Sequence, residues 1–184
     1  MLVGDGGYQR WAAFLEQWRA GSAHHPPDLP TLVEQDYPAE VWLRLVTRLT
    51  DALAHRLQTW ADGLIDAMAA TRDEFETARA LTQARRGLAA IRAVAGHPAL
   101  PGKLTRALRD QVDEQIRLVQ RALEDGIDDA RRAGLDDRLV QARLRTLRDN
   151  PLTVPDRSAA GTGWAAAPAR PGRRIIVDPP VRPT

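Results

Sequence analysis

Residues 38–95 read PAEVWLRLVTRLTDALAHRLQTWADGLIDAMAATRDEFETARALTQARRGLAAIRAVA, a stretch without proline after its first position. Apolar and aromatic side chains recur along it at steps of mostly three or four residues, which places them on one side of an α-helix. This stripe consists of Trp42, Leu45, Leu49, Leu53, Leu57, Trp60, Leu64, Met68, Phe75, Ala78, Leu81, Leu88, Ile91 and Ala95. One continuous helix over this stretch would be roughly 85 Å long at 1.5 Å per residue.

In the middle of this stretch, the sequence allows either a continuous helix or a break. Thr71 is a possible N-cap, and the acids at Asp73 and Glu74 suit the first turn of a helix, so a break within 70–73 is one alternative. Ala69 and Ala70 favour helix through the same point. We expect a continuous or kinked helix. Its first half also carries apolar residues beside the stripe, at Val41, Val46 and Ile65, and this width predicts contacts with two partners.

Three further helices are predicted from apolar periodicity. Residues 8–20 form a short amphipathic segment that ends at glycine, and residues 102–133 form a second long helix. Residues 136–147 form a last short helix, capped by Asp136 or Asp137, before Asn150-Pro151. The short proline-bracketed turn at 98–102 makes the two long helices antiparallel neighbours, so residues 78–95 should lie against residues 104–123. The fold class is therefore all-α: a long antiparallel helical hairpin or coiled-coil-like bundle with short flanking helices. On the second long helix, we expect Asp113 to pair with Arg117.

The predicted domain organisation has three parts. Residues 1–37 carry the short helix and a proline-rich loop, residues 38–150 form the helical hairpin, and residues 151–184 form a tail rich in Pro, Ala and Arg. The composition of the tail is typical of disordered segments. Within it, the cluster around Ile175, Ile176 and Val177 is apolar and β-prone, which is typical of a short linear motif that binds a partner.

The apolar stripes predict self-association or assembly with another protein. A short helix with two Trp on one face is not stable alone and must dock, either on the long helix or on another chain. The helices of one chain also look insufficient to cover every stripe. We therefore expect a homo-oligomer or a component of a larger assembly. The residues expected to bind the partner are Trp11, Trp18, Trp42, Trp60 and Leu64.

Composition excludes several classes of site. The chain has no cysteine, so it lacks disulfides, thiolate metal sites and cysteine nucleophiles. Adjacent His24 and His25 do not point at a common ion, and no Glu-x-x-His pair occurs, so we expect no metal and no cofactor. No phosphate loop or serine elbow is present, and we predict that the protein is not an enzyme. No long apolar run predicts a membrane span, and we expect a cytoplasmic protein.

The alternative function is nucleic-acid binding. Arginines cluster in and before the last predicted helix, opposite its apolar side, as in a recognition helix. They are Arg131, Arg132, Arg138, Arg143, Arg145 and Arg148. Asp136, Asp137 and Asp149 offset this charge, which weakens the affinity expected for phosphates. The sequence therefore favours a non-enzymatic adaptor or assembly component that acts through its long helices and its C-terminal motif. A nucleic-acid-associated regulator is the second reading.

Overall fold

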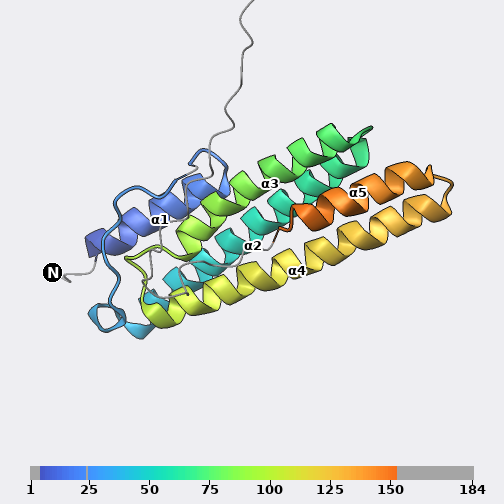
Figure 1. Ribbon diagram of the computed structural model, residues 1–184. Helices are drawn as coiled ribbons and strands as arrows, with labels where there is room; N and C mark the ends of the chain where they lie inside the picture. The colour runs from blue at the N-terminus through green and yellow to red at the C-terminus, as the bar shows by residue number, and fades with distance from the viewer. Residues whose placement is uncertain (1–4, 24, 153–184) are drawn as a thin grey trace, which may run out of the picture. The chain divides into compact units, whose positions relative to one another are not determined.

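The computed structural model describes residues 5–23 and 25–152, and in this part of the chain the secondary structure is entirely helical (Figure 1). The helices are α1 (Asp5–Arg19), α2 (Ala39–Ala70), α3 (Glu74–Ala95), α4 (Gly102–Arg132) and α5 (Asp137–Asp149), with one 3-10 turn at Glu34–Asp36. The predicted all-α class is confirmed. The predicted tail disorder and the motif at Ile175, Ile176 and Val177 lie outside the described residues.

The single long helix predicted over residues 38–95 is wrong, because the chain reverses at residues 71–73. Thr71 is extended, and α3 starts after Asp73, whose carboxylate accepts a hydrogen bond from the Glu76 amide at 2.8 Å. The Glu76 carboxylate in turn accepts from the Arg72 amide at 2.7 Å. The Glu76 amide is one of those that a helix start leaves without a partner inside the helix, and the Arg72 amide lies one residue before the cap. Asp73 is thus the cap, whereas the Thr71 hydroxyl donates to the Met68 carbonyl at 2.8 Å.

The three long helices pack side by side. α3 runs back along α2, and α4 runs back along α3, so α2 and α4 are parallel to each other (Figure 1). The predicted packing of residues 78–95 against the start of the following helix is confirmed by the contacts between α3 and α4. Buried Leu53, Leu88 and Ile116, one from each helix, belong to the same hydrophobic core. The stripe that looked too exposed for one chain is therefore buried largely within the chain.

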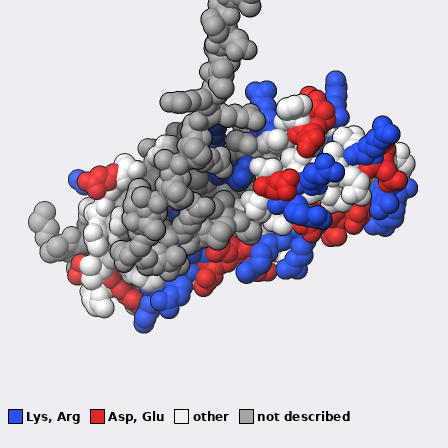
Figure 2. Space-filling view, viewed as in Figure 1, with Lys and Arg blue, Asp and Glu red and all other residues white. Residues whose placement is uncertain are grey.

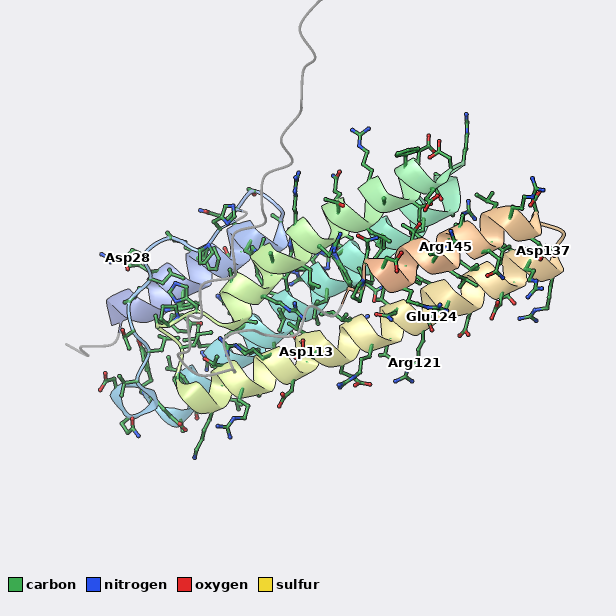
Figure 3. The ribbon with its side chains drawn as sticks, in the orientation of Figure 1. Asp28, Asp113, Arg121, Glu124, Asp137 and Arg145 are labelled. Carbon is green, nitrogen blue, oxygen red and sulfur yellow. The ribbon has the colours of Figure 1, made fainter. Side chains whose placement is uncertain are left out.

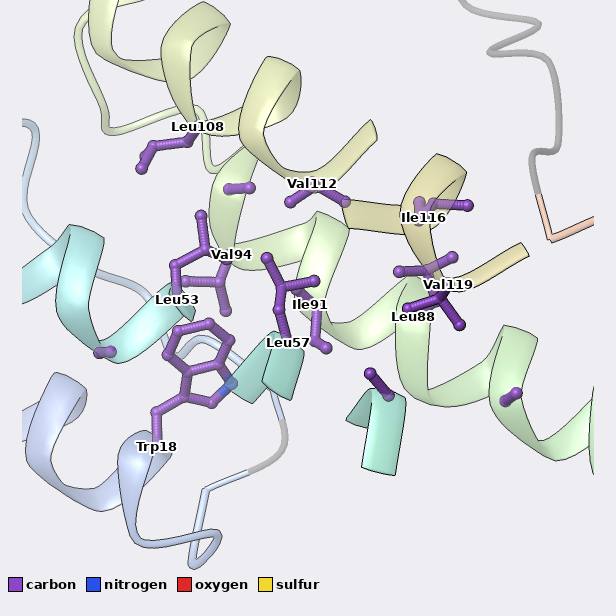
Figure 4. Packing of buried hydrophobic residues seen from close by; sticks show 14 of the residues in the cluster. Trp18, Leu53, Leu57, Leu88, Ile91, Val94, Leu108, Val112, Ile116 and Val119 are labelled. Atoms are coloured by element: carbon purple, nitrogen blue, oxygen red, sulfur yellow. The ribbon is translucent and has the colours of Figure 1, made fainter. Parts of the chain in front are cut away.

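α1 packs against α2, as expected for the first of the two docking alternatives. Its Trp18 side chain points toward Leu53 and Leu57 of α2 and toward Ile91 and Val94 of α3 (Figure 4). The loop after α1 returns to the start of α2. The Leu32 amide on this loop donates to the Ala99 carbonyl at 2.8 Å, which ties the loop to the turn between α3 and α4.

α5 packs on α3 and α4, close to the turn between α2 and α3. Of the two predicted caps, Asp136 is the one that forms, because its carboxylate accepts from the Arg138 amide at 2.7 Å. Gly134 makes the preceding turn at a φ of 97°, a conformation that favours glycine. After α5, Arg85 of α3 donates to the Asn150 side chain at 3.0 Å. This contact fixes the end of α5 along α3.

Within the described residues, every helix is too short or too polar to span a bilayer.

Candidate interaction face

Trp11 and Trp18, predicted to bind a partner, are completely buried within the chain. The Trp11 indole N–H donates to the Pro30 carbonyl at 2.9 Å, and its ring meets the His97 ring edge-on at 5.4 Å. Trp18 lies under the Arg56 guanidinium, whose carbon is 6.0 Å from the ring centroid. Such stacking of a cation on an indole is favourable. Both tryptophans therefore hold α1 and its loop against the rest of the bundle.

The other three predicted binding residues are also covered, in whole or in part. Leu64 is buried in the core, and Trp60 is half-buried with its N–H donating to the Ala84 carbonyl of α3 at 2.9 Å. Gly87 of α3 lies so close that an added Cβ would be 3.3 Å from the Trp60 ring. Trp42 is half-buried and stacks on Tyr37 at 6.2 Å between centroids.

Trp11, Trp18 and Leu64 belong to the hydrophobic core, and Trp42 and Trp60 pack against it. Their side chains are therefore largely covered by the same chain. Their role in binding a partner stays a prediction. Burial raises the pKa of Tyr37, the ring on which Trp42 stacks, and the Asp36 carboxylate adds to this effect.

The arginines of the predicted nucleic-acid-binding surface divide into two groups. Arg131 pairs with Asp137 at 2.9 Å, and Arg132 pairs with Asp129 at 2.5 Å. Arg143 turns inward and donates to the Thr71 carbonyl, at the end of α2. Asp137 and Asp129 neutralise Arg131 and Arg132, so these two contribute little net charge toward a phosphate backbone. Arg143 keeps its charge, because a carbonyl is neutral, but its guanidinium is bonded inside the fold rather than presented on the surface.

Arg138, Arg145 and Arg148 form the second group and are exposed on α5. Basic and acidic side chains are intermixed around the end of the bundle that carries the turn between α4 and α5 (Figure 2). Figure 3 shows Arg145 on α5 and Asp137 at the start of the same helix. Nucleic-acid binding stays a prediction, and the arrangement lacks a continuous basic surface on the face that Figure 2 displays.

Over the described ranges, no group of three or more His, Cys, Asp or Glu side chains is placed to hold a metal ion.

Large exposed apolar side chains mark a different surface from the predicted one. Among the described residues they are Val33, Leu43, Ile65, Phe75 and Leu118. Phe75 is 86% exposed, directly after the turn between α2 and α3. Leu43, Ile65 and Leu118 are 65%, 42% and 46% exposed, and all three belong to the parallel pair α2 and α4. Three of the five therefore come from two neighbouring helices.

Contacts along α2 show which side of the helix these residues occupy. Arg48 pairs with Glu16 of α1 and Trp60 bonds to α3, so these two residues mark the sides that face α1 and α3. At 100° per residue, Leu43 and Ile65 fall on the flank beyond α4, away from both. On α4, Asp113 pairs with Arg92 of α3 at 3.0 Å and marks the side toward α3. Leu118 falls on the other flank, next to α2.

We call this surface the α2/α4 face and define it by its exposed, uncharged side chains. They are Leu43, Thr47, Ala54, Ile65, Leu118 and Ala122. Half-buried Gln111 and Gln115 continue the uncharged row on α4. No other helix of the described residues makes extensive contacts with both α2 and α4, except α3 on the core side. Leu43 and Ile65, at the two ends of the face, are 22 positions apart, or about 33 Å along the helix.

The sequence contained part of the signal for this face. Ile65 is apolar and lies beside the stripe, and Leu43 and Leu118 are leucines outside the stripes of their helices. A leucine outside the stripe of its own helix is the feature that could have identified them. Their common location could not be deduced, because it depends on α2 and α4 becoming neighbours after the reversal at residues 71–73.

Comparison with known proteins gives no match: no family model fits the chain, and no curated protein or solved structure resembles it significantly.

Proposed function

We propose that this protein is a non-enzymatic protein–protein interaction module, an adaptor or assembly component, and that the α2/α4 face is its principal binding surface. The observation that carries the proposal is the concentration of exposed Leu43, Ile65 and Leu118 on two adjacent helices. Exposed apolar side chains gathered on one side of a domain mark interaction sites, whereas isolated ones need no explanation.

The charge distribution also favours the α2/α4 face as the binding surface, in preference to the end of the bundle that carries α5. Uncharged Thr47, Ala54 and Ala122 separate the larger apolar residues, so no buried charge would have to be desolvated on binding. Small residues also allow a partner helix to approach closely.

The test is affinity capture from the source cells with three forms of the full chain. The face variant combines Leu43→Ser, Ile65→Ser and Leu118→Ser, and the control is Phe75→Ser, which removes an apolar side chain elsewhere. We expect circular dichroism to show equal helix content, and we expect only the face variant to lose the captured partner. Equal capture by all three forms would contradict the proposal.

A second binding element is proposed for the C-terminal segment around Ile175, Ile176 and Val177, which lies outside the described residues. Its support is the sequence alone, a short β-prone apolar cluster in a Pro- and Ala-rich stretch. Deleting residues 172–184 in the same capture experiment should remove a partner that the face variant retains.

A further inference from the structure

The α2/α4 face is bordered by charged side chains on both helices. Their net charge indicates the chemistry of the partner. On α2, the row on the solvent side of the face contains Glu40, Arg44, Asp51 and Asp62, all exposed. Glu40 and Arg44 pair with each other at 3.8 Å. Two aspartates therefore remain along the border of α2.

The border on α4 is mixed but also acidic. Its exposed charged residues are Lys103, Asp110, Glu114, Arg117, Arg121, Asp125, Asp128 and Arg132. Arg117 Nε donates to the Glu114 carboxylate at 3.0 Å, and Arg132 pairs with Asp129. Three aspartates then stand against Lys103 and Arg121. Figure 3 shows Arg121 pointing outward from α4. Both borders of the face thus carry net negative charge.

We propose that the partner is a basic amphipathic helix, whose apolar stripe lies along the α2/α4 face and whose flanking Arg or Lys side chains meet the two acidic borders. This inference rests on the proposed function, and it adds the chemistry of the partner. A helix of about 22 residues would match the length of the face. Recognition of an amphipathic helix by an apolar surface is a recurring mode of peptide binding.

The alternative occupant, a second copy of this chain, is disfavoured by the same charges. If two copies met through this face, acidic borders would oppose acidic borders, and like charges across an interface oppose association. A basic helix turns the same borders into a favourable field, which also speeds the encounter of the two molecules.

The test uses the full chain and three synthetic 22-residue peptides. The first has a leucine stripe flanked by arginine, the second has the same stripe flanked by glutamate, and the third is a scrambled form of the first. Binding is measured by fluorescence anisotropy at 50 and 500 mM salt, and the location of binding by amide chemical shifts.

We expect the arginine peptide to bind and to shift amides around Leu43, Ile65 and Leu118. The glutamate and scrambled peptides should bind at least about tenfold more weakly, because one lacks the charge and the other lacks the stripe. High salt should weaken the binding of the arginine peptide, because it screens the attraction between charges. The triple serine variant of the face should lose most of the binding, whereas Phe75→Ser should retain it.

Other outcomes would overturn the inference in distinguishable ways. Equal binding of the arginine and glutamate peptides would show that the borders do not select charge, while the proposed function would stand. Equal binding of the scrambled peptide would show nonspecific attraction. A dimer in light scattering that the triple serine variant abolishes, with no binding of the arginine peptide, would show that a second copy occupies the face.

Discussion

The indole of Trp18 joins three helices, because it extends from α1 toward apolar residues of both α2 and α3 (Figure 4). We predict that Trp18→Ala lowers the free energy of unfolding by about 3–5 kcal/mol, since it removes a large side chain from the core and leaves a cavity. Urea denaturation followed by circular dichroism measures the change.

The matched control is Phe75→Ala, which also removes an aromatic ring, but one that is 86% exposed. It should change the free energy of unfolding by no more than about 0.5 kcal/mol. Similar losses in both variants would show that α1 is not held by the core as described.

At the residue scale, the sequence predicted which side chains avoid water but not what covers them. The spacing of Leu49, Leu53 and Leu57 places them on one face of α2, and all three are buried. For Trp11 and Trp18, the same pattern allowed docking on the chain itself or on another chain. Only the position of α1 along α2 and α3 distinguishes these possibilities.

At the scale of elements, the reversal at residues 71–73 determines the arrangement of the bundle, and its Asp73 cap can be tested. Asp73→Ala should lower the free energy of unfolding by about 0.5–2 kcal/mol, because the Glu76 amide loses its acceptor. Asp73→Asn is the control and should retain most of the stability, since asparagine caps helices as well as aspartate. Thermal and urea unfolding of both variants make the comparison.

Arg143 provides a second test at this scale, because it links α5 to the turn between α2 and α3. Arg143→Ala should lower the free energy of unfolding by about 1–3 kcal/mol, the range for a hydrogen bond from a charged group. Amide hydrogen exchange should also become faster around Thr71. Arg145→Ala, on the exposed side of α5, should leave both quantities nearly unchanged. If instead the two variants behaved alike, Arg143 would not fasten α5.

Local signals predicted some elements correctly and others not. Glycine and proline defined the turns around α4, and Asp136 was one of the two residues expected to start α5. The break after Ala70 was visible only as an alternative, because the helix propensity of Ala69 and Ala70 competed with the capping residues. The expected pair of Asp113 and Arg117 is also wrong: Asp113 pairs with Arg92 of α3, while Arg117 pairs with Glu114. A contact four residues away on an exposed surface is worth only a few tenths of a kcal/mol, so a packed neighbouring helix can replace it.

At the scale of the whole molecule, the candidate binding surface is defined by the helices that do not cover it. α1 packs on α2 beside α3, and α5 packs on α3 and α4. The remaining side of the α2 and α4 pair carries Leu43, Ile65 and Leu118. Helical periodicity determines the inner and outer sides of each helix, but not the positions of short helices along long ones. The α2/α4 face could therefore not be predicted from the sequence.

The docking site of α1 has a consequence for the order of events during synthesis. α1 leaves the ribosome before α3, yet its tryptophans contact Val94 and His97, which are made about eighty residues later (Figure 4). Contacts between distant parts of a chain form late, because the intervening loop must first be ordered. Until α3 has emerged, Trp11 and Trp18 lack part of their cover, and nascent chains with bare aromatic surface are prone to aggregate or to recruit chaperones. Ribosomes stalled before residue 90 should therefore present an N-terminal segment that is accessible to proteases, whereas stalling after α4 should protect it.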